Sequence, residues 1–112
     1  MEGMQPIQIE GIKEIDLLKT KIVEQISPLK IYLFGSYAEG RQTEDSDYDF
    51  YIVVRDDTRD MVETTAKAYQ SIRHIKQRPV DILVGTNSRF EERKWKPTVE
   101  NEVFTKGVLI YG

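Results

Sequence analysis

A chain of 112 residues is long enough for one domain with a stable hydrophobic core and too short for two such domains. It contains no cysteine and one histidine, which excludes disulfides, thiolate metal sites and metal sites built on several histidines. The net charge of −3, with 31% charged residues, argues against broad nucleic-acid binding, although Arg73, Lys76 and Arg78 form a local basic cluster.

The N-terminal segment shows no targeting signal. Residues 1–6 have no basic flank, and no long apolar run follows them. We therefore expect no signal peptide and no membrane span, and a cytoplasmic protein.

Hydrophobic residues at helical spacing open the chain. They predict an amphipathic helix over about residues 9–27, which ends before Pro28 because a residue that precedes proline is pushed out of the helical region. The apolar run 30–34 predicts a short buried strand. The residues of the predicted helix face are Ile12, Ile15, Leu18, Ile22, Val23 and Ile26.

Gly35 and Ser36 stop this strand. A short helix is expected over residues 36–40, with Ser36 as its N-cap, followed by a polar loop over residues 41–46. Alternation of side chains then predicts a strand over residues 47–54. The core side of this strand would carry Tyr48, Phe50, Ile52 and Val54, and the other side Asp47, Asp49 and Tyr51.

The second half of the chain repeats this alternation of helices and strands. A turn at 55–57 leads to a helix over residues 58–77, and a strand over 80–84 ends at Gly85. After a polar stretch, Pro97 opens a last helix near 97–106, and a strand over 108–111 follows. The inward residues of the 58–77 helix would be Met61, Thr65, Ala68, Ile72 and Ile75. The order predicts an α/β (α+β) fold, a small mixed sheet flanked by helices, with strand directions left open.

One spacing carries the chemical information: Gly35-Ser36, ten residues, then Asp47-x-Asp49. Residues two apart on a strand point to the same face, so both carboxylates can share one site, where they repel unless a cation neutralises them. Mg²⁺ prefers one or two carboxylates together with substrate phosphates. Gly35 and Ser36, at a helix start, offer backbone N–H groups and a hydroxyl to those phosphates.

Asp81 is the third carboxylate. It interrupts an otherwise apolar strand, which we expect to be central in the sheet, and a carboxylate in a central strand is costly unless it is paired or bound to metal. It is the candidate on the acceptor side, as a metal ligand or as the group that takes the hydroxyl proton. Two plainer interpretations stay open: Asp47 and Asp49 as solvated carboxylates that open a strand, and Asp81 in a salt bridge to Arg73 or Arg78.

This pattern resembles the nucleotidyltransferase superfamily of DNA polymerase beta, in particular its minimal members. The matching segments are Phe34-Gly35-Ser36-Tyr37-Ala38, Gly40, Ser46-Asp47-Tyr48-Asp49-Phe50, Val80-Asp81-Ile82 and the closing Lys106-Gly107-Val108-Leu109-Ile110-Tyr111. The resemblance implies the nucleotidyltransferase fold over residues 1–112 as a single domain, and transfer of a nucleoside monophosphate from an NTP such as ATP.

The resemblance also implies roles for individual residues. Gly35 and Ser36 would hold the NTP phosphates, and Asp47, Asp49 and Asp81 would bind two Mg²⁺ ions. Relatives often carry arginine where this chain has Glu39, and Arg41 lies two residues further on.

A partner protein follows from the same resemblance. Minimal members are often encoded beside a small helical HEPN protein, for which they act as antitoxin and to which they can transfer AMP. Two other functions stay open: an antitoxin that binds without catalysis, and transfer to a small-molecule hydroxyl. Trp95 is either a core anchor or an interface residue, and His74 is expected at the surface.

Overall fold

The computed structural model of the protein describes residues 9–112. Its first helix, α1 (Ile9–Ile26), buries Ile15, Leu18 and Ile22 against the sheet. Ile12 was predicted on the same helix face, but its side chain is 54% exposed. At 3.6 residues per turn, Ile12 lies about 87° around the helix from the mean direction of these three buried residues, which turns its side chain to solvent.

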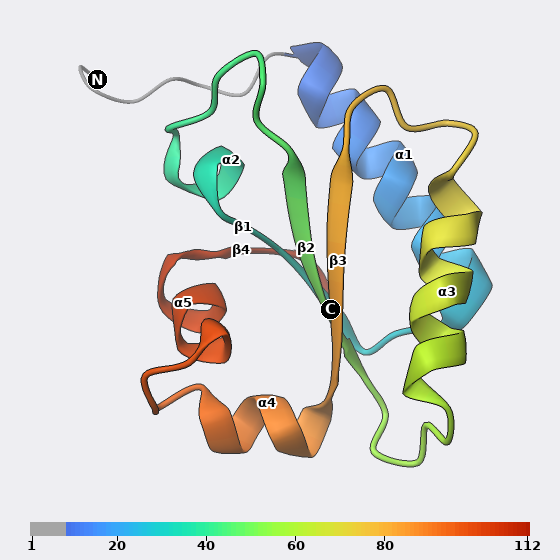
Figure 1. Ribbon diagram of the computed structural model, residues 1–112, viewed down its shortest axis with the longest axis vertical. Coiled ribbons are helices and arrows are strands. Elements are labelled where there is room, and N and C mark those ends of the chain that lie inside the picture. Colours follow the sequence, from blue (N-terminus) through green and yellow to red (C-terminus); the bar gives the residue numbers. More distant parts are fainter. Residues whose placement is uncertain (1–8) are drawn as a thin grey trace.

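Four strands form one mixed sheet in the order β3-β2-β1-β4 (Figure 1). Strand β1 pairs antiparallel with both β2 and β4, whereas β2 and β3 run parallel. The parallel pair needs a crossover, which α3 (Met61–Ile72) supplies. The strands are β1 (Lys30–Phe34), β2 (Tyr48–Val54), β3 (Val80–Thr86) and β4 (Val108–Tyr111).

The sheet has a hydrophobic cluster on each face. Helices α1 and α3 cover one face, and α4 (Asn87–Arg93) and α5 (Val99–Lys106) lie on the other (Figure 1). The larger cluster includes Tyr48, Phe50, Ile52 and Val54, as the alternation predicts. The smaller cluster consists of Tyr32, Tyr51, Val53, Phe90 and Val103, with Phe34 against it. The fold class predicted from the sequence is confirmed, including the mixed sheet.

Several predicted boundaries are wrong. The 58–77 helix is confined to α3, because the Asp60 side chain caps its start by accepting from the Glu63 N–H at 2.9 Å. The stretch before Pro97 contains α4, which the sequence did not predict. The last helix begins at Val99 because the Thr98 side chain is its N-cap. Within the described part of the chain, no helix is long and apolar enough to cross a membrane.

The start of the short helix α2 (Ser36–Glu39) also differs from the prediction. Ser36 is its first residue, and Gly35 is the N-cap. Gly40 closes the helix in the left-handed conformation, with φ of 72°. In residues 9–112, no side chain makes a capping hydrogen bond at the start of this helix. Its first backbone N–H groups are therefore available to a ligand.

Candidate functional site

The register of β1 and β2 brings the two halves of the sequence motif together. Phe34, which precedes Gly35, pairs with Asp49. Gly35 has φ of 77°, a conformation that favours glycine, and a Cβ atom there would overlap the Asp49 carboxylate. The start of α2 and the Asp49 side chain thus share one small volume, as the expected phosphate and metal roles require.

The parallel pairing of β2 and β3 brings in the third carboxylate. Asp49 and Asp81 are register partners, so their side chains project from the same face of the sheet. Asp47 lies one residue before β2 begins, yet its charge still acts on Asp49. The three aspartates singled out from the sequence therefore come together beside Gly35.

Asp49 is the most perturbed acid of this group. Burial raises its pKa to about 6, and the charges of Asp81, Asp47 and Glu102 add to the effect. Glu102, on α5, is a fourth acid that sequence reasoning missed. No motif marks it, because it joins the site only through the packing of α5 against β1. The site thus concentrates negative charge around a half-buried carboxylate, which favours a bound cation.

Asp81 is not in the central strand that the sequence argument assumed. Strand β3 forms an edge of the sheet, and the Asp81 side chain is exposed. The hydrophobic pattern of β3 arises because one of its faces packs on α3 while the other is half open. Exposure removes the burial argument for Asp81 but leaves this carboxylate accessible to an incoming acceptor.

Arg78, one of the two salt-bridge partners considered for Asp81, has a different role. Its Nη1 donates hydrogen bonds of 3.0 Å to the carbonyl oxygens of Glu44 and Ser46. Its guanidinium lies over the rings of Tyr37 and Tyr48, at 5.6 and 5.8 Å from the ring centroids. Arg78 therefore clamps the loop that delivers Asp47 to the site, a role for which the sequence offers no signal.

The oxygen donors of this site suit Mg²⁺ although they do not enclose an ion by themselves. Among residues 9–112, no three acidic or imidazole side chains already converge in an arrangement that encloses a metal ion. Mg²⁺ does not demand such a cage, because it binds one or two carboxylates and completes its shell with phosphate oxygens and water. Hard oxygen donors, and an Asp49 whose anionic form is disfavoured by burial and by its acidic neighbours, fit this ion.

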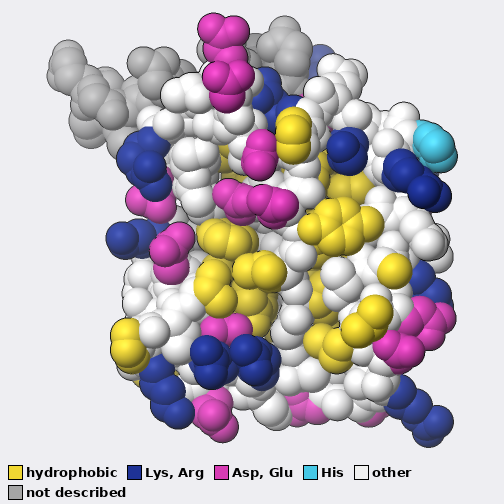
Figure 2. Space-filling view, viewed as in Figure 1, with side chains coloured by type: hydrophobic (Ala, Val, Ile, Leu, Met, Phe, Trp, Pro, Cys, Tyr) yellow, Lys and Arg dark blue, Asp and Glu magenta, His cyan; other side chains and the backbone are white. Residues whose placement is uncertain are grey.

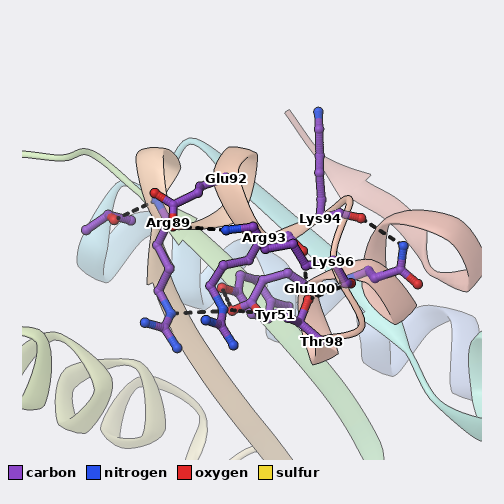
Figure 3. Close-up of polar contacts among 10 residues, drawn as sticks. Tyr51, Arg89, Glu92, Arg93, Lys94, Lys96, Thr98 and Glu100 are labelled. Atoms are coloured by element: carbon purple, nitrogen blue, oxygen red, sulfur yellow. Dashed lines mark hydrogen bonds and ion pairs between the residues drawn. The ribbon is translucent and has the colours of Figure 1, made fainter.

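Two residues beyond Asp49, on the same face of the sheet, Tyr51 joins a buried polar network (Figure 3). Glu100, on α5, is only 2% exposed and accepts a hydrogen bond of 2.7 Å from the Tyr51 hydroxyl. Arg93 donates to it from Nε at 3.1 Å, and Arg89 Nε lies at 3.5 Å. Burial alone would raise the pKa of Glu100, but these donors hold it below its usual value. Alternation predicts Tyr51 on the side of β2 that faces away from the main core. That side is also buried at Tyr51, because the second hydrophobic cluster covers it.

Charged and apolar side chains occupy different parts of the surface on this face of the molecule. Figure 2 shows acidic side chains grouped above a hydrophobic area, with Lys and Arg side chains below it. Leu83, at 43% exposure on the half-open face of β3, lies two residues beyond Asp81. The face thus combines an acidic end, an apolar middle and a basic end.

Three further predicted residues can be placed. Arg41 forms an ion pair with Glu39 at 3.2 Å, so the charge of this arginine is balanced locally. His74 is exposed, as expected. Trp95 is 71% exposed and packs edge-on to Phe104, with ring centroids 5.1 Å apart, which excludes a role as core anchor.

Comparisons with known proteins identify the fold. A family model described as a nucleotidyltransferase domain matches residues 15–110. No curated protein matches the chain. Among solved structures, the chain is similar to a toxin–antitoxin crystal structure with AMP-PNP, at a TM-score of 0.61 and 26% identity, over 87% of this chain and 73% of the other.

Two more solved structures share the fold. A mutant of the MntA–HpeT toxin–antitoxin pair aligns with a TM-score of 0.58 and 24% identity, over 88% of this chain and 73% of the other. A candidate nucleotidyltransferase from Sulfolobus solfataricus aligns with a TM-score of 0.55 and 23% identity, over 97% and 90% of the two chains. At these identities the likeness supports the fold alone.

Proposed function

This chain belongs to the nucleotidyltransferase domain family, and we propose that it transfers AMP from ATP to a hydroxyl group of a helical HEPN-type partner, with Mg²⁺ as cofactor. The observation that carries the proposal is the meeting of Gly35 with Asp49, which in turn pairs with Asp81. A domain that only binds a partner has no need to hold acidic side chains beside an open helix start.

The nucleotide would be bound at the start of α2. The polyphosphate would accept hydrogen bonds from the backbone N–H groups that follow Gly35 and from the Ser36 hydroxyl. Asp47 and Asp49 would hold the Mg²⁺ ion at this site. Mg²⁺ held there would offset the negative charge of carboxylates and phosphates and stabilise the departing pyrophosphate.

The acceptor would enter from the β3 side. Its hydroxyl oxygen forms a bond to the α-phosphorus, the bond from that phosphorus to the bridging oxygen of pyrophosphate breaks, and pyrophosphate leaves with the electron pair. The hydroxyl proton passes to Asp81 or, through it, to solvent. Exposure of Asp81 at the edge of the sheet suits a carboxylate that must meet a second protein.

The proposed partner rests on similarity. The 26% identical structure is a toxin–antitoxin complex with AMP-PNP, an ATP analogue. Its likeness to this chain supports an antitoxin role and a preference for ATP. The HEPN identity of the partner and the protein hydroxyl as acceptor follow from the minimal members that the motifs resemble.

A labelling experiment tests this function. The purified chain would be incubated with Mg²⁺, ATP labelled at the α-phosphate, and the helical protein encoded by the neighbouring gene. We expect label on the partner with the wild type and none with the Asp47→Ala/Asp49→Ala double variant. An Asp57→Asn variant is the matched control, because this exposed carboxylate pairs with Arg55 outside the proposed site.

Complex formation would be measured in parallel for the same variants. Transfer that is lost while binding is retained would support catalysis by the aspartates. Tight binding without any labelling by the wild type would contradict the proposal and leave an antitoxin that acts by contact.

A further inference from the structure

Two arginines of α4 converge on one buried carboxylate. Arg93 Nε donates to Glu100 at 3.1 Å, and Arg89 Nε lies 3.5 Å from the second oxygen. One guanidinium would balance the charge of Glu100, and the Tyr51 hydroxyl already supplies a further donor. The second arginine leaves one positive charge in excess on this surface.

The excess charge faces outward. Both arginines direct Nε at Glu100, and Figure 3 shows the two guanidinium groups side by side, turned away from α4. The side chains are 57% and 36% exposed for Arg89 and Arg93. A guanidinium held by its Nε keeps its terminal N–H groups for a bidentate contact with a carboxylate or phosphate and loses little entropy on binding.

The pair lies within reach of the proposed acceptor side. Arg89 Nε lies 3.5 Å from the Glu100 oxygen that accepts from the Tyr51 hydroxyl, and Tyr51 pairs with Leu83, two residues beyond the Asp49–Asp81 pair. Helix α4 begins directly after Thr86, five residues beyond Asp81. At about 3.3 Å per strand residue, the guanidinium groups lie roughly 7 to 16 Å from the aspartates along β3.

We propose that Arg89 and Arg93 form a docking site for an acidic segment of the acceptor protein. This inference rests on the proposed function. The segment would lie along β3, with its carboxylates on the arginines, an apolar side chain on Leu83 and its acceptor hydroxyl at Asp81. In an extended segment the acidic residues would therefore be two to five positions from the acceptor residue.

The charge around the arginines favours an acidic peptide over a nucleic acid. Glu91 and Glu92 lie between the two arginines along the chain, and the lysines that follow, Lys94 and Lys96, form ion pairs with these two glutamates. The chain as a whole carries a net charge of −3. A phosphate backbone would be repelled by this background, whereas two carboxylates can be matched one to one.

Peptide binding provides the test. The probes are fluorescently labelled peptides of about ten residues, each with one tyrosine and, about four positions away, either two glutamates or two glutamines. At low ionic strength we expect the wild type to bind the glutamate peptide about threefold to tenfold more tightly, as exposed ion pairs allow. We expect Arg89→Gln to lose this preference and Arg89→Lys to keep part of it. Arg73→Gln, which removes an exposed arginine outside the face, should keep all of it.

Arg89→Gln distinguishes the loss of a peptide contact from damage to the fold. Arg89→Gln leaves the Tyr51 and Arg93 hydrogen bonds to Glu100 in place, so the fold and the ATP affinity should be unchanged. Equal binding of the two peptides by the wild type, including no binding of either, would overturn the inference. A loss of ATP affinity in Arg89→Gln would also overturn it, as would tighter Arg89-dependent binding of single-stranded RNA. Because none of these readouts needs turnover, absence of AMP transfer would contradict the proposed function alone.

Discussion

Asp49 and Asp81 face each other in register across two parallel strands, and the charge of Asp47 also acts on Asp49. The folded chain therefore gathers like charges that the unfolded chain keeps apart. A bound cation would relieve this repulsion, and so would a neutral side chain at position 49. The two effects can be measured separately, because a bound cation would support catalysis, whereas a neutral side chain at position 49 would abolish it.

Replacing Asp49 by asparagine should stabilise the protein near neutral pH. The pKa of Asp49 is about 6 in the folded chain against 3.8 as the ordinary value. The folded state thus takes up the proton first as the pH falls. The contribution of Asp49 to the free energy of unfolding is lowest above pH about 6 and rises as the pH falls toward 4. We expect Asp49→Asn to gain about 1 to 3 kcal/mol at neutral pH.

Urea denaturation at neutral pH and near pH 4 provides the measurement. The difference between wild type and Asp49→Asn should shrink on acidification, whereas Asp57→Asn, on the exposed Arg55 pair, should not show this trend. A difference that is independent of pH would mean that Asp49 is not perturbed in this way.

Gly35→Ala should damage nucleotide binding more than it damages the fold. The new methyl group would meet the Asp49 carboxylate and would force a side chain into a backbone conformation with φ of 77°. We expect a stability loss of about 1 to 3 kcal/mol and a rise of about tenfold or more in the Kd for ATP with Mg²⁺.

Titration calorimetry would measure that affinity. Gly85→Ala is the matched control, because its methyl group would meet the Tyr51 hydroxyl instead of the aspartates. Stability should fall in both variants but ATP affinity only in the first. An unchanged ATP affinity in Gly35→Ala would exclude the start of α2 as the phosphate site.

Arg78→Ala should release the loop before Asp47. The loss of two hydrogen bonds to the carbonyls of Glu44 and Ser46, and of the contacts with Tyr37 and Tyr48, should cost about 1 to 3 kcal/mol. Hydrogen exchange in residues 41–47 should become faster, and kcat should fall more than the ATP affinity. Arg73→Ala, at the exposed end of α3, is the control. Protection in this loop that survives the Arg78 change would exclude the clamp.

Tyr51→Phe should destabilise the chain through Glu100. Removal of the hydroxyl takes one donor from a carboxylate that is 2% exposed, which costs about 1 to 3 kcal/mol. Thermal unfolding would measure the loss. The neighbouring Tyr32→Phe lies in the same hydrophobic cluster without a bond to Glu100 and should cost less. Equal losses would show that the hydrogen bond contributes little.

Much of the site could be predicted from the sequence because its determinants are local. The spacing of Gly35-Ser36 and Asp47-x-Asp49 follows from a strand, a helix start and a returning strand, and alternation identified the core face of β2. The role of Ser36 as N-cap was wrong, because the left-handed Gly35 occupies that position. The expected phosphate role of Ser36 does not depend on its being the N-cap, and it stays a prediction.

The features that could not be predicted depend on contacts between segments that are far apart in the sequence. Helix α4 escaped prediction because Phe90 is its one fully buried side chain in a run of polar residues. Glu102 and Glu100 belong to an ordinary acidic helix until α5 packs on the sheet and gives them different environments. Asp81 read as a central-strand residue because an apolar run does not reveal whether its strand lies at an edge.

The most direct test of the account is transfer of labelled AMP to the neighbouring helical protein by wild type and by an Asp47→Asn/Asp49→Asn variant, each with Mg²⁺ and with EDTA. We expect labelling by the wild type with Mg²⁺ alone, and no labelling by the Asn variant although it is folded and binds the partner. Labelling by the Asn variant, or by the wild type in EDTA, would contradict a metal-dependent transfer at these aspartates.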